Sequence, residues 1–224
     1  MKKLLLLSIL ISLSTLTSCV KKGCDFSGPH QFQIPVNLNP AKDTFRIGDT
    51  ISISSTFSEE VFELKTQRAY TLDDFKFFPE TRITKWETHP DSIIIDNTAL
   101  PNFEVLIDTI YDYEHFYFSF GEVSLTGQYK HQNGFYDLKY QLIPQKEGLY
   151  WFGQSSCLFA LGDDQDFSGK CRNHDVDGHV RLNEGADNNV DFIKYNPDGS
   201  TSVFWERQDE KFHVFGGYCF YVVE

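Results

Sequence analysis

The stretch Ile51-Ser52-Ile53-Ser54-Ser55-Thr56-Phe57 alternates side chains suited to a protein interior with side chains suited to water. Successive side chains of a β-strand point to opposite faces, so this period of two predicts a strand whose buried face carries Ile51, Ile53 and Ser55. Gly48 and Asp49, just before the stretch, are typical of a turn. This segment is the clearest sign of β-structure in the chain.

Similar short runs follow along the chain and are separated by turn residues. We predict further strands at residues 92–95, 103–107, 116–120, 135–142, 149–152, 190–195, 202–205, 212–215 and 218–223. Turn signals between them include Asn133-Gly134 and Gly216-Gly217. No segment sustains a long amphipathic pattern, and only residues 72–78 fit one or two helical turns. These patterns predict an all-β protein.

The segment Lys146-Glu147-Gly148-Leu149-Tyr150 resembles the tyrosine corner of immunoglobulin-like sandwiches, in which a Tyr hydroxyl bonds back to the backbone. Antibody domains place a Cys two residues after that Tyr, whereas this chain has Phe152. The resemblance covers residues 31–155 and implies a looser immunoglobulin-like β-sandwich without the antibody core disulfide. Residues 156–224 are too few to bury a core of their own, so we expect a disulfide-braced C-terminal β elaboration, with 155 as the alternative boundary.

Composition limits the classes of partner. The 224 residues include 20 Lys and Arg against 32 Asp and Glu, a formal net charge of −12. Binding to nucleic acid needs a basic face, so nucleic acid is excluded as an expected partner. Hydrophobic residues make up 41% of the chain and aromatic residues 16%, which is enough to build a folded core.

The first residues predict export. Met1-Lys2-Lys3 is followed by the apolar stretch from Leu4 to Leu16, which is shorter than the roughly 20 residues of a membrane-spanning helix. This arrangement is typical of a secretory signal peptide. The segment Leu16-Thr17-Ser18-Cys19 at its end resembles the lipobox of bacterial lipoproteins.

That resemblance implies cleavage before Cys19, acylation of its thiol, and membrane attachment through the lipid. We therefore expect a signal peptide at 1–18, a lipid-anchored tether at 19–29 and a β-sandwich domain at 30–224. The expected location is the cell envelope. Val20 stands where an Asp often retains such proteins at the inner membrane, so the outer membrane is favoured.

Four cysteines remain after Cys19, namely Cys24, Cys157, Cys171 and Cys219. Thiols of an exported protein meet an oxidising compartment, where disulfides persist. Of the three connectivities we prefer Cys157 with Cys171 and Cys24 with Cys219. The alternative is a zinc site that uses Cys171, His174, His179 and an acid.

Residues 173–184 resemble a calcium-binding loop in the spacing of their oxygen-bearing side chains. The candidate ligands are Asn173, Asp175, Asp177, the His179 carbonyl and Glu184. Calcium takes six to eight oxygen ligands, which this set is able to supply, so calcium is the one candidate cofactor. Neither flank predicts a helix, so an acidic turn without metal is the alternative.

Aromatic residues are the other candidate binding feature. Trp86, Trp151 and Trp205, together with Tyr111, Tyr113 and Tyr117, would suit a stacking platform for sugars or for a partner protein. Phe116, Phe118 and Phe120 alternate, which predicts a core-facing set.

No catalytic motif stands out, because the chain has neither a Gly-x-Ser-x-Gly segment nor a His-Glu-x-x-His segment. We therefore expect a non-catalytic binding or envelope-organising protein with a protein or glycan partner. The first alternative is a carbohydrate-binding module stabilised by calcium. The second is an envelope hydrolase that uses two facing carboxylates, drawn from neighbouring acids such as Glu59 and Glu60.

Overall fold

The computed structural model describes residues 25–89, 92–96, 98–119, 121–157, 165–172, 174–194 and 207–224. Its strands are β1 (His30–Asn39), β2 (Thr44–Arg46), β3 (Ile51–Ser58), β4 (Glu60–Glu63), β5 (Arg68–Thr71), β6 (Phe78–His89), β7 (Ser92–Asp96), β8 (Phe103–Ile107), β9 (Tyr113–Tyr117), β10 (Val123–Gly127), β11 (Lys130–Gln132), β12 (Phe135–Pro144), β13 (Gly148–Cys157), β14 (Val176–Leu182) and β15 (Gly217–Val223). The helical elements are the 3-10 turns η2 (Leu100–Asn102) and η3 (Asn183–Gly185), the short helix α2 (Asp191–Lys194) and the π-helix η5 (Asp209–Val214). The all-β prediction is confirmed.

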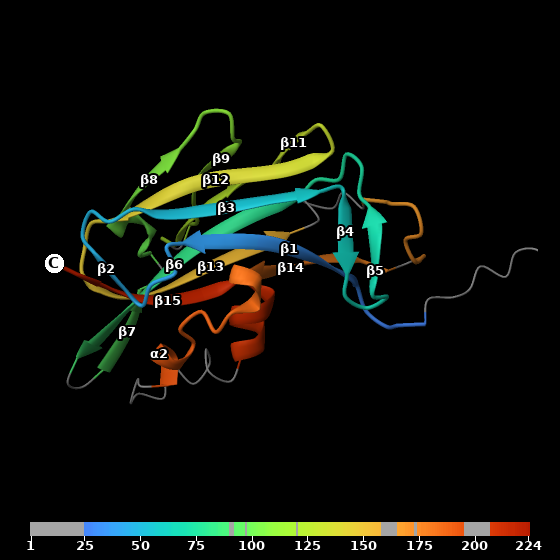
Figure 1. Ribbon diagram of the computed structural model, residues 1–224. Coiled ribbons are helices and arrows are strands. Elements are labelled where there is room, and N and C mark those ends of the chain that lie inside the picture. The colour runs from blue at the N-terminus through green and yellow to red at the C-terminus, as the bar shows by residue number, and fades with distance from the viewer. Residues whose placement is uncertain are drawn as a thin grey trace, which may run out of the picture.

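Strand β1 joins the two layers of the fold (Figure 1). Its first part pairs in parallel with β14, from His30 opposite Val176 to Val36 opposite Leu182. Its last residues turn to the other layer and pair antiparallel with β3. The resulting strand order is β11-β12-β3-β1-β14-β13-β6-β10-β9, which wraps around a common core as a β-sandwich.

The core follows the period of two in the strands. In β3, Ile51, Ile53 and Ser55 are buried while the residues between them reach the surface, as predicted. The Ser55 hydroxyl donates to the Pro35 carbonyl at 2.6 Å, which satisfies a polar group that burial removes from water. In β1, Phe32, Ile34 and Val36 face the same interior. Every second residue of β1 therefore points outward.

The tyrosine corner is present. The Tyr150 hydroxyl donates to the Lys146 carbonyl at 3.0 Å, four residues upstream, at the entry to β13. The ring is buried and packs edge-on against Phe103 with 5.0 Å between ring centroids. One hydroxyl therefore ties the turn before β13 to the core.

We expect Tyr150→Phe to lower the free energy of unfolding by about 1 kcal/mol, because it removes this hydrogen bond and keeps the packing of the ring. Urea unfolding followed by circular dichroism measures the change. Tyr221→Phe serves as the control, because Tyr221 lies on the solvent face of β15. Equal midpoints for the two variants would contradict a stabilising role for the corner.

The C-terminal segment is part of the same sheet. Strand β15 pairs antiparallel with β13, from Gly148 opposite Val222 to Gly153 opposite Gly217, and its end pairs in parallel with β2. A second, smaller core forms where α2 and η5 cover the outer side of these strands. It contains Trp86, Trp151, Val190, Phe212 and Cys219. No helix among the described residues is long and apolar enough to span a membrane.

Two strand predictions in this C-terminal segment are wrong. Residues 191–194 form α2 and residues 209–214 form η5, where strands were expected at 190–195 and 212–215. Short apolar runs do not distinguish strand from helix, and here Val190 and Phe212 are buried by packing on the second core. The strand expected at 202–205 lies outside the described residues.

Two further local predictions are wrong. Residues 72–77 form no helix; Asp73 and Asp74 form a turn, after which Phe75 and Phe77, two residues apart, both reach the main core before β6 begins. The strand expected at 116–120 is β9, Tyr113–Tyr117, and it lies at the edge of the sheet. Phe116 is 49% exposed there, so its predicted burial is also wrong.

Candidate functional site

The outward face of the β1 and β14 pair carries two adjacent rows of polar side chains. The parallel register places Gln33 opposite His179 and Pro35 opposite Arg181. Their neighbours Ile34 and Val180 are buried, so alternation directs these side chains away from the core. Two segments that are far apart in the sequence thus share one polar surface.

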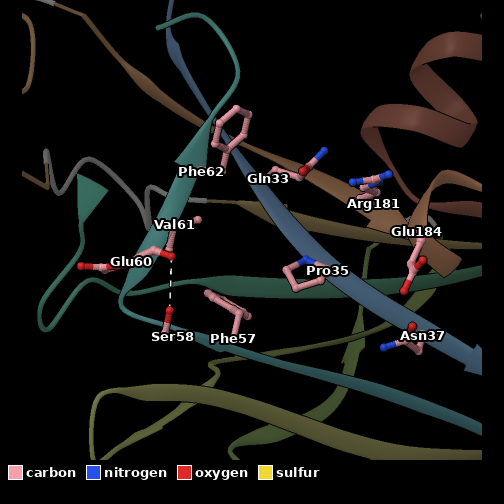
Figure 2. Close-up of a pocket in the computed structure, with 10 residues that line it drawn as sticks. All are labelled: Gln33, Pro35, Asn37, Phe57, Ser58, Glu60, Val61, Phe62, Arg181 and Glu184. Atoms are coloured by element: carbon pink, nitrogen blue, oxygen red, sulfur yellow. Dashed lines mark hydrogen bonds between the residues drawn. The ribbon is translucent and has the colours of Figure 1, made fainter. Parts of the chain in front are cut away.

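This surface is hollowed into two cavities that meet at Gln33 and Arg181, and we call them together the β1–β14 groove. The first cavity has a volume of about 310 Å³ and lies toward the β4–β5 hairpin (Figure 2). Its lining residues are Gln33, Pro35, Asn37, Phe57, Ser58, Glu60, Val61, Phe62, Arg181 and Glu184. The second cavity, of about 340 Å³, lies toward η5. Its lining residues are Gln33, Leu64, His179, Val180, Arg181, Leu182, Gly185, Asp209, Phe212, His213 and Val214.

The first cavity combines carboxylates with apolar ring faces. Figure 2 shows Glu60 at one end and Glu184 at the other, with the Glu184 carboxylate turned toward Asn37 rather than toward Arg181. Phe62 is 38% exposed and lines the same wall. This cavity therefore offers hydrogen-bond acceptors beside an apolar surface.

The second cavity contains two imidazoles. His179 is half-buried, and its Nε2 lies 3.8 Å from a carboxylate oxygen of Asp177. Burial lowers the pKa of His179 and outweighs the opposing effect of Asp177, so the imidazole is neutral at pH 7. His213 and Asp209 reach the cavity from η5. This end of the groove is therefore rich in nitrogen donors.

Glu184 is held in an unusual backbone conformation at the end of the groove. Asn183, Glu184 and Gly185 have φ angles of 48°, 58° and 78°. The Asn183 side chain accepts a hydrogen bond from the Leu38 amide at 2.8 Å, which fixes this turn to β1. A left-handed conformation is costly for glutamate, so the surrounding contacts set the position of its carboxylate.

The predicted calcium loop is wrong. Residues 176–182 form β14, an extended strand of about 20 Å, and Glu184 lies in the turn η3 beyond its end, so Asp177 and Glu184 are held apart and do not encircle an ion. The strand forms because Val176, Val180 and Leu182 alternate into the core. No group of three or more His, Cys, Asp or Glu side chains among the described residues is arranged to hold a metal. Asn173 lies outside those residues.

The predicted pairing of Cys24 with Cys219 is also wrong, because Cys219 is a free thiol, fully enclosed in the second core beside Trp86 and Trp151. Burial raises the pKa of this thiol well above its ordinary value. Cys171 is disulfide-bonded, which removes it from the alternative zinc site. Cys24 and the side chain of Cys157 lie outside the described part of the chain, so the partner of Cys171 stays a prediction.

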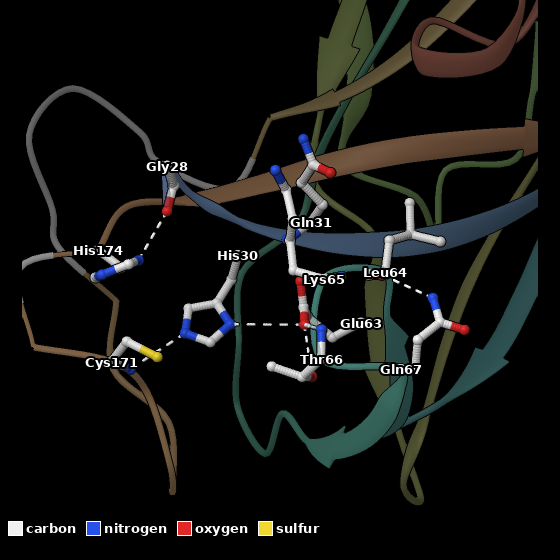
Figure 3. A network of polar contacts seen from close by, with 10 residues as sticks. All are labelled: Gly28, His30, Gln31, Glu63, Leu64, Lys65, Thr66, Gln67, Cys171 and His174. Atoms are coloured by element: carbon white, nitrogen blue, oxygen red, sulfur yellow. Dashed lines mark hydrogen bonds and ion pairs between the residues drawn. The ribbon is translucent and has the colours of Figure 1, made fainter. Parts of the chain in front are cut away.

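A buried polar network closes the end of the sandwich where β1 begins (Figure 3). The Cys171 amide donates to His30 Nε2 at 3.1 Å, so the ring proton is on Nδ1, which lies 4.0 Å from a Glu63 oxygen. Both side chains are 0% exposed. No ligand reaches these groups, and the network is structural.

The Glu63 carboxylate accepts four hydrogen bonds within this network. The amides of Gln31 and Lys65 donate to one oxygen at 2.8 and 3.0 Å, and the amide and hydroxyl of Thr66 donate to the other, both at 2.6 Å. Burial favours the neutral acid, but these hydrogen bonds together outweigh it and lower the pKa of Glu63. Glu63 is therefore a buried anion that fastens the β4–β5 hairpin to β1.

The aromatic residues and acids that the sequence suggested as binding or catalytic groups do not come together in one site. Trp86, Trp151 and Tyr113 are buried, so the predicted aromatic platform is wrong for these three, although Tyr117 is 71% exposed on β9. The Glu59 carboxylate pairs with His131 Nε2 at 2.8 Å, and Asp74 lies 3.7 Å from the other nitrogen of the same ring. Cys19 and Trp205 lie outside the described residues.

The groove residues that the sequence predictions missed are Gln33, Phe62, Arg181 and His213, whereas Glu60 was expected as a catalytic acid. For Gln33 and Arg181 the one signal in the sequence is the alternation in residues 30–39 and 176–182, and Phe62 and His213 lie outside both runs. That signal predicts outward-facing side chains but not the pairing of the two strands.

Comparison with known proteins returned no matching family model and no matching curated protein. Among solved structures, the reeler domain of human F-spondin is similar at 11% identity with a TM-score of 0.31, over 67% of this chain and 88% of that chain. AvmM, which catalyses macrocyclization in alchivemycin A biosynthesis, is similar at 10% identity with a TM-score of 0.27, over 65% and 83%. ACE19, the collagen-binding subdomain of the Enterococcus faecalis surface protein ACE, is similar at 7% identity with a TM-score of 0.18, over 65% of this chain and 92% of that chain. These likenesses are too remote to indicate a function.

Proposed function

We propose that this protein is a lipid-anchored, non-catalytic binding protein of the bacterial cell envelope that binds a glycan in the β1–β14 groove. The lipobox-like segment at Cys19 and the preceding signal-peptide pattern support the anchor. Ten residues separate Cys19 from His30, the first residue of β1, so the folded domain begins close to the lipid. Val20 favours the outer membrane.

The composition of the groove carries the proposal of a glycan. Sugar hydroxyls pair with planar polar groups that accept or donate two hydrogen bonds, and the groove presents the amides of Gln33 and Asn37 with the carboxylates of Glu60 and Glu184. The C–H face of a sugar ring packs on aromatic surface, which Phe62 supplies at the same wall. A cavity of this size holds one or two sugar rings.

Binding is tested with the full-length protein, purified in detergent, on an array of neutral, amino, uronic-acid and phosphorylated oligosaccharides. We expect a defined set of oligosaccharides to bind, and Phe62→Ala to weaken that binding at least about tenfold by removing the packing surface. Phe116→Ala, on the exposed edge strand β9, is the matched control and leaves binding unchanged. An array on which no oligosaccharide binds would contradict the proposed glycan binding.

Anchoring is tested separately with Cys19→Ala in a bacterial host. We expect the parent protein to incorporate an alkyne-labelled palmitate analogue and to sediment with membranes, because acyl chains contribute roughly 0.8 kcal/mol per buried CH₂. The variant is expected to lose the label and to leave the membrane fraction. Cys24→Ala, five residues later, is the control and keeps both. Unlabelled parent protein would contradict lipidation.

A further inference from the structure

We propose that the second cavity of the β1–β14 groove is an anion subsite in which Arg181 binds a carboxylate or phosphate group carried by the ligand. The inference rests on the proposed glycan function and adds the chemical class of the ligand. It also assigns the two cavities different tasks, with neutral hydroxyls in the first and the acidic substituent in the second.

The first observation concerns the charge of Arg181. Its side chain is exposed, and within the described part of the chain it makes no hydrogen bond and no ion pair. The protein has 32 acidic residues against 20 Lys and Arg, so a cation inside a cavity has many carboxylates available to neutralise it. Arg181 is left without one, although Glu184 is only three residues away. Its five N–H donors remain free for a ligand.

The second observation concerns how Arg181 is held. It lies in β14 opposite Pro35, between the fully buried Val180 and Leu182, so its backbone belongs to the rigid centre of the sheet. Its Nε lies 3.4 Å from the position that a Cβ at Gly185 would occupy, so the absence of a side chain there leaves room for the guanidinium stem. A guanidinium is able to bind a planar or tetrahedral oxyanion with two parallel hydrogen bonds, and here it extends from a fixed point on the sheet.

The third observation concerns the neighbours of Arg181. Gln33 lines both cavities beside it and supplies an amide donor, and His179 and His213 supply imidazole nitrogens from β14 and η5. Among the described residues that line the second cavity, Asp209 is the one acid, and it lies at the η5 wall. Asp177 lies beside His179.

The first cavity, by contrast, carries Glu60 and Glu184, which repel an anion. Arg181 lines both cavities, and it is accompanied by two acids in the first cavity and by Asp209 in the second, so the groove is less acidic at its η5 end. A ligand with an acidic group at one end fits it in one orientation.

The test uses the same full-length protein and array. We expect the bound set to consist of oligosaccharides that carry a uronic acid or a phosphate, and the two arms of the array show which of these anions the site takes. A bound set of neutral sugars alone would overturn this inference and leave the glycan function standing. No binding at all would overturn the glycan function itself.

Variants then locate the anion. Arg181→Gln keeps a planar N–H donor group and removes the charge, and we expect it to weaken binding of the acidic oligosaccharides at least about tenfold. Glu184→Gln removes a repelling charge and is expected to strengthen that binding. Arg46→Gln, in β2 and outside both cavities, is the matched control. Unchanged affinity of Arg181→Gln, with a native circular dichroism spectrum, would overturn the subsite.

Discussion

Replacing Glu63 with glutamine is expected to lower the free energy of unfolding by about 3 kcal/mol. Each oxygen of this buried carboxylate accepts two hydrogen bonds, and two of the donors are the backbone amides of Gln31 and Lys65. The glutamine amide group has one acceptor atom, so either orientation sets an N–H₂ group against N–H or O–H donors. Buried donors then lose their partners.

Urea unfolding at pH 7 measures this loss, with the exposed Glu104→Gln as the control. The effect also depends on pH in a defined direction. The pKa of Glu63 is lowered from 4.5 by folding, so its contribution to stability is complete above about pH 4.5 and is lost as the pH falls through the folded value. The difference between parent and variant should therefore narrow in acid. A loss under 1 kcal/mol at pH 7 would show that Glu63 is buried as the neutral acid.

The second large effect is expected at Gly178, in the middle of β14. A Cβ built there would lie 2.3 Å from the Ser156 carbonyl oxygen, a backbone atom of β13 that is unable to move aside alone. Gly178 is paired directly with Ser156, so the two strands would have to separate. We expect Gly178→Ala to lower the free energy of unfolding by about 3 kcal/mol.

The same variant distinguishes the strand from the calcium loop predicted for this segment. In a calcium loop the glycine supplies a sharp turn, and calcium would compensate part of the loss. In β14 the glycine serves close packing, and calcium has no effect. Thermal unfolding of Gly178→Ala is measured with about 5 mM calcium, a saturating excess for such loops, and again with a chelator. The comparison distinguishes the strand from the calcium loop. Thr44→Ala, at an exposed position of β2, is the control. Rescue by calcium would contradict the strand.

The sequence predicted the strands whose alternation is made of strongly apolar residues. Residues 51–57 and 103–107 became β3 and β8 with nearly the same limits. The Gly-x-Tyr motif also predicted a contact, the Tyr150 hydroxyl with the Lys146 carbonyl, because that hydrogen bond is local and its geometry is set by the turn.

Strand β14 was missed because its outward residues are Asp177, His179 and Arg181, which by type resemble a metal loop. Its inward residues nevertheless alternate with a period of two. The groove was not predictable at all from either strand alone, because its shape depends on Pro35 lying opposite Arg181, a register fixed by long-range packing. Helices α2 and η5 were predicted as strands for a related reason. Their buried residues pack on the second core from a covering layer and do not belong to the sheet.

The pairing of β1 with strands of both layers has a mechanical consequence. A lipid attached at Cys19 would transmit any pull on the protein to His30, the first residue of β1. From there, the parallel pairing with β14 continues without interruption to Val36. A force along this strand loads those pairings together, as shear, and not one after another as in the peeling of a hairpin. The domain would therefore resist extraction by tension at the very point where it is tethered, with β14 and the groove above it as the stressed part.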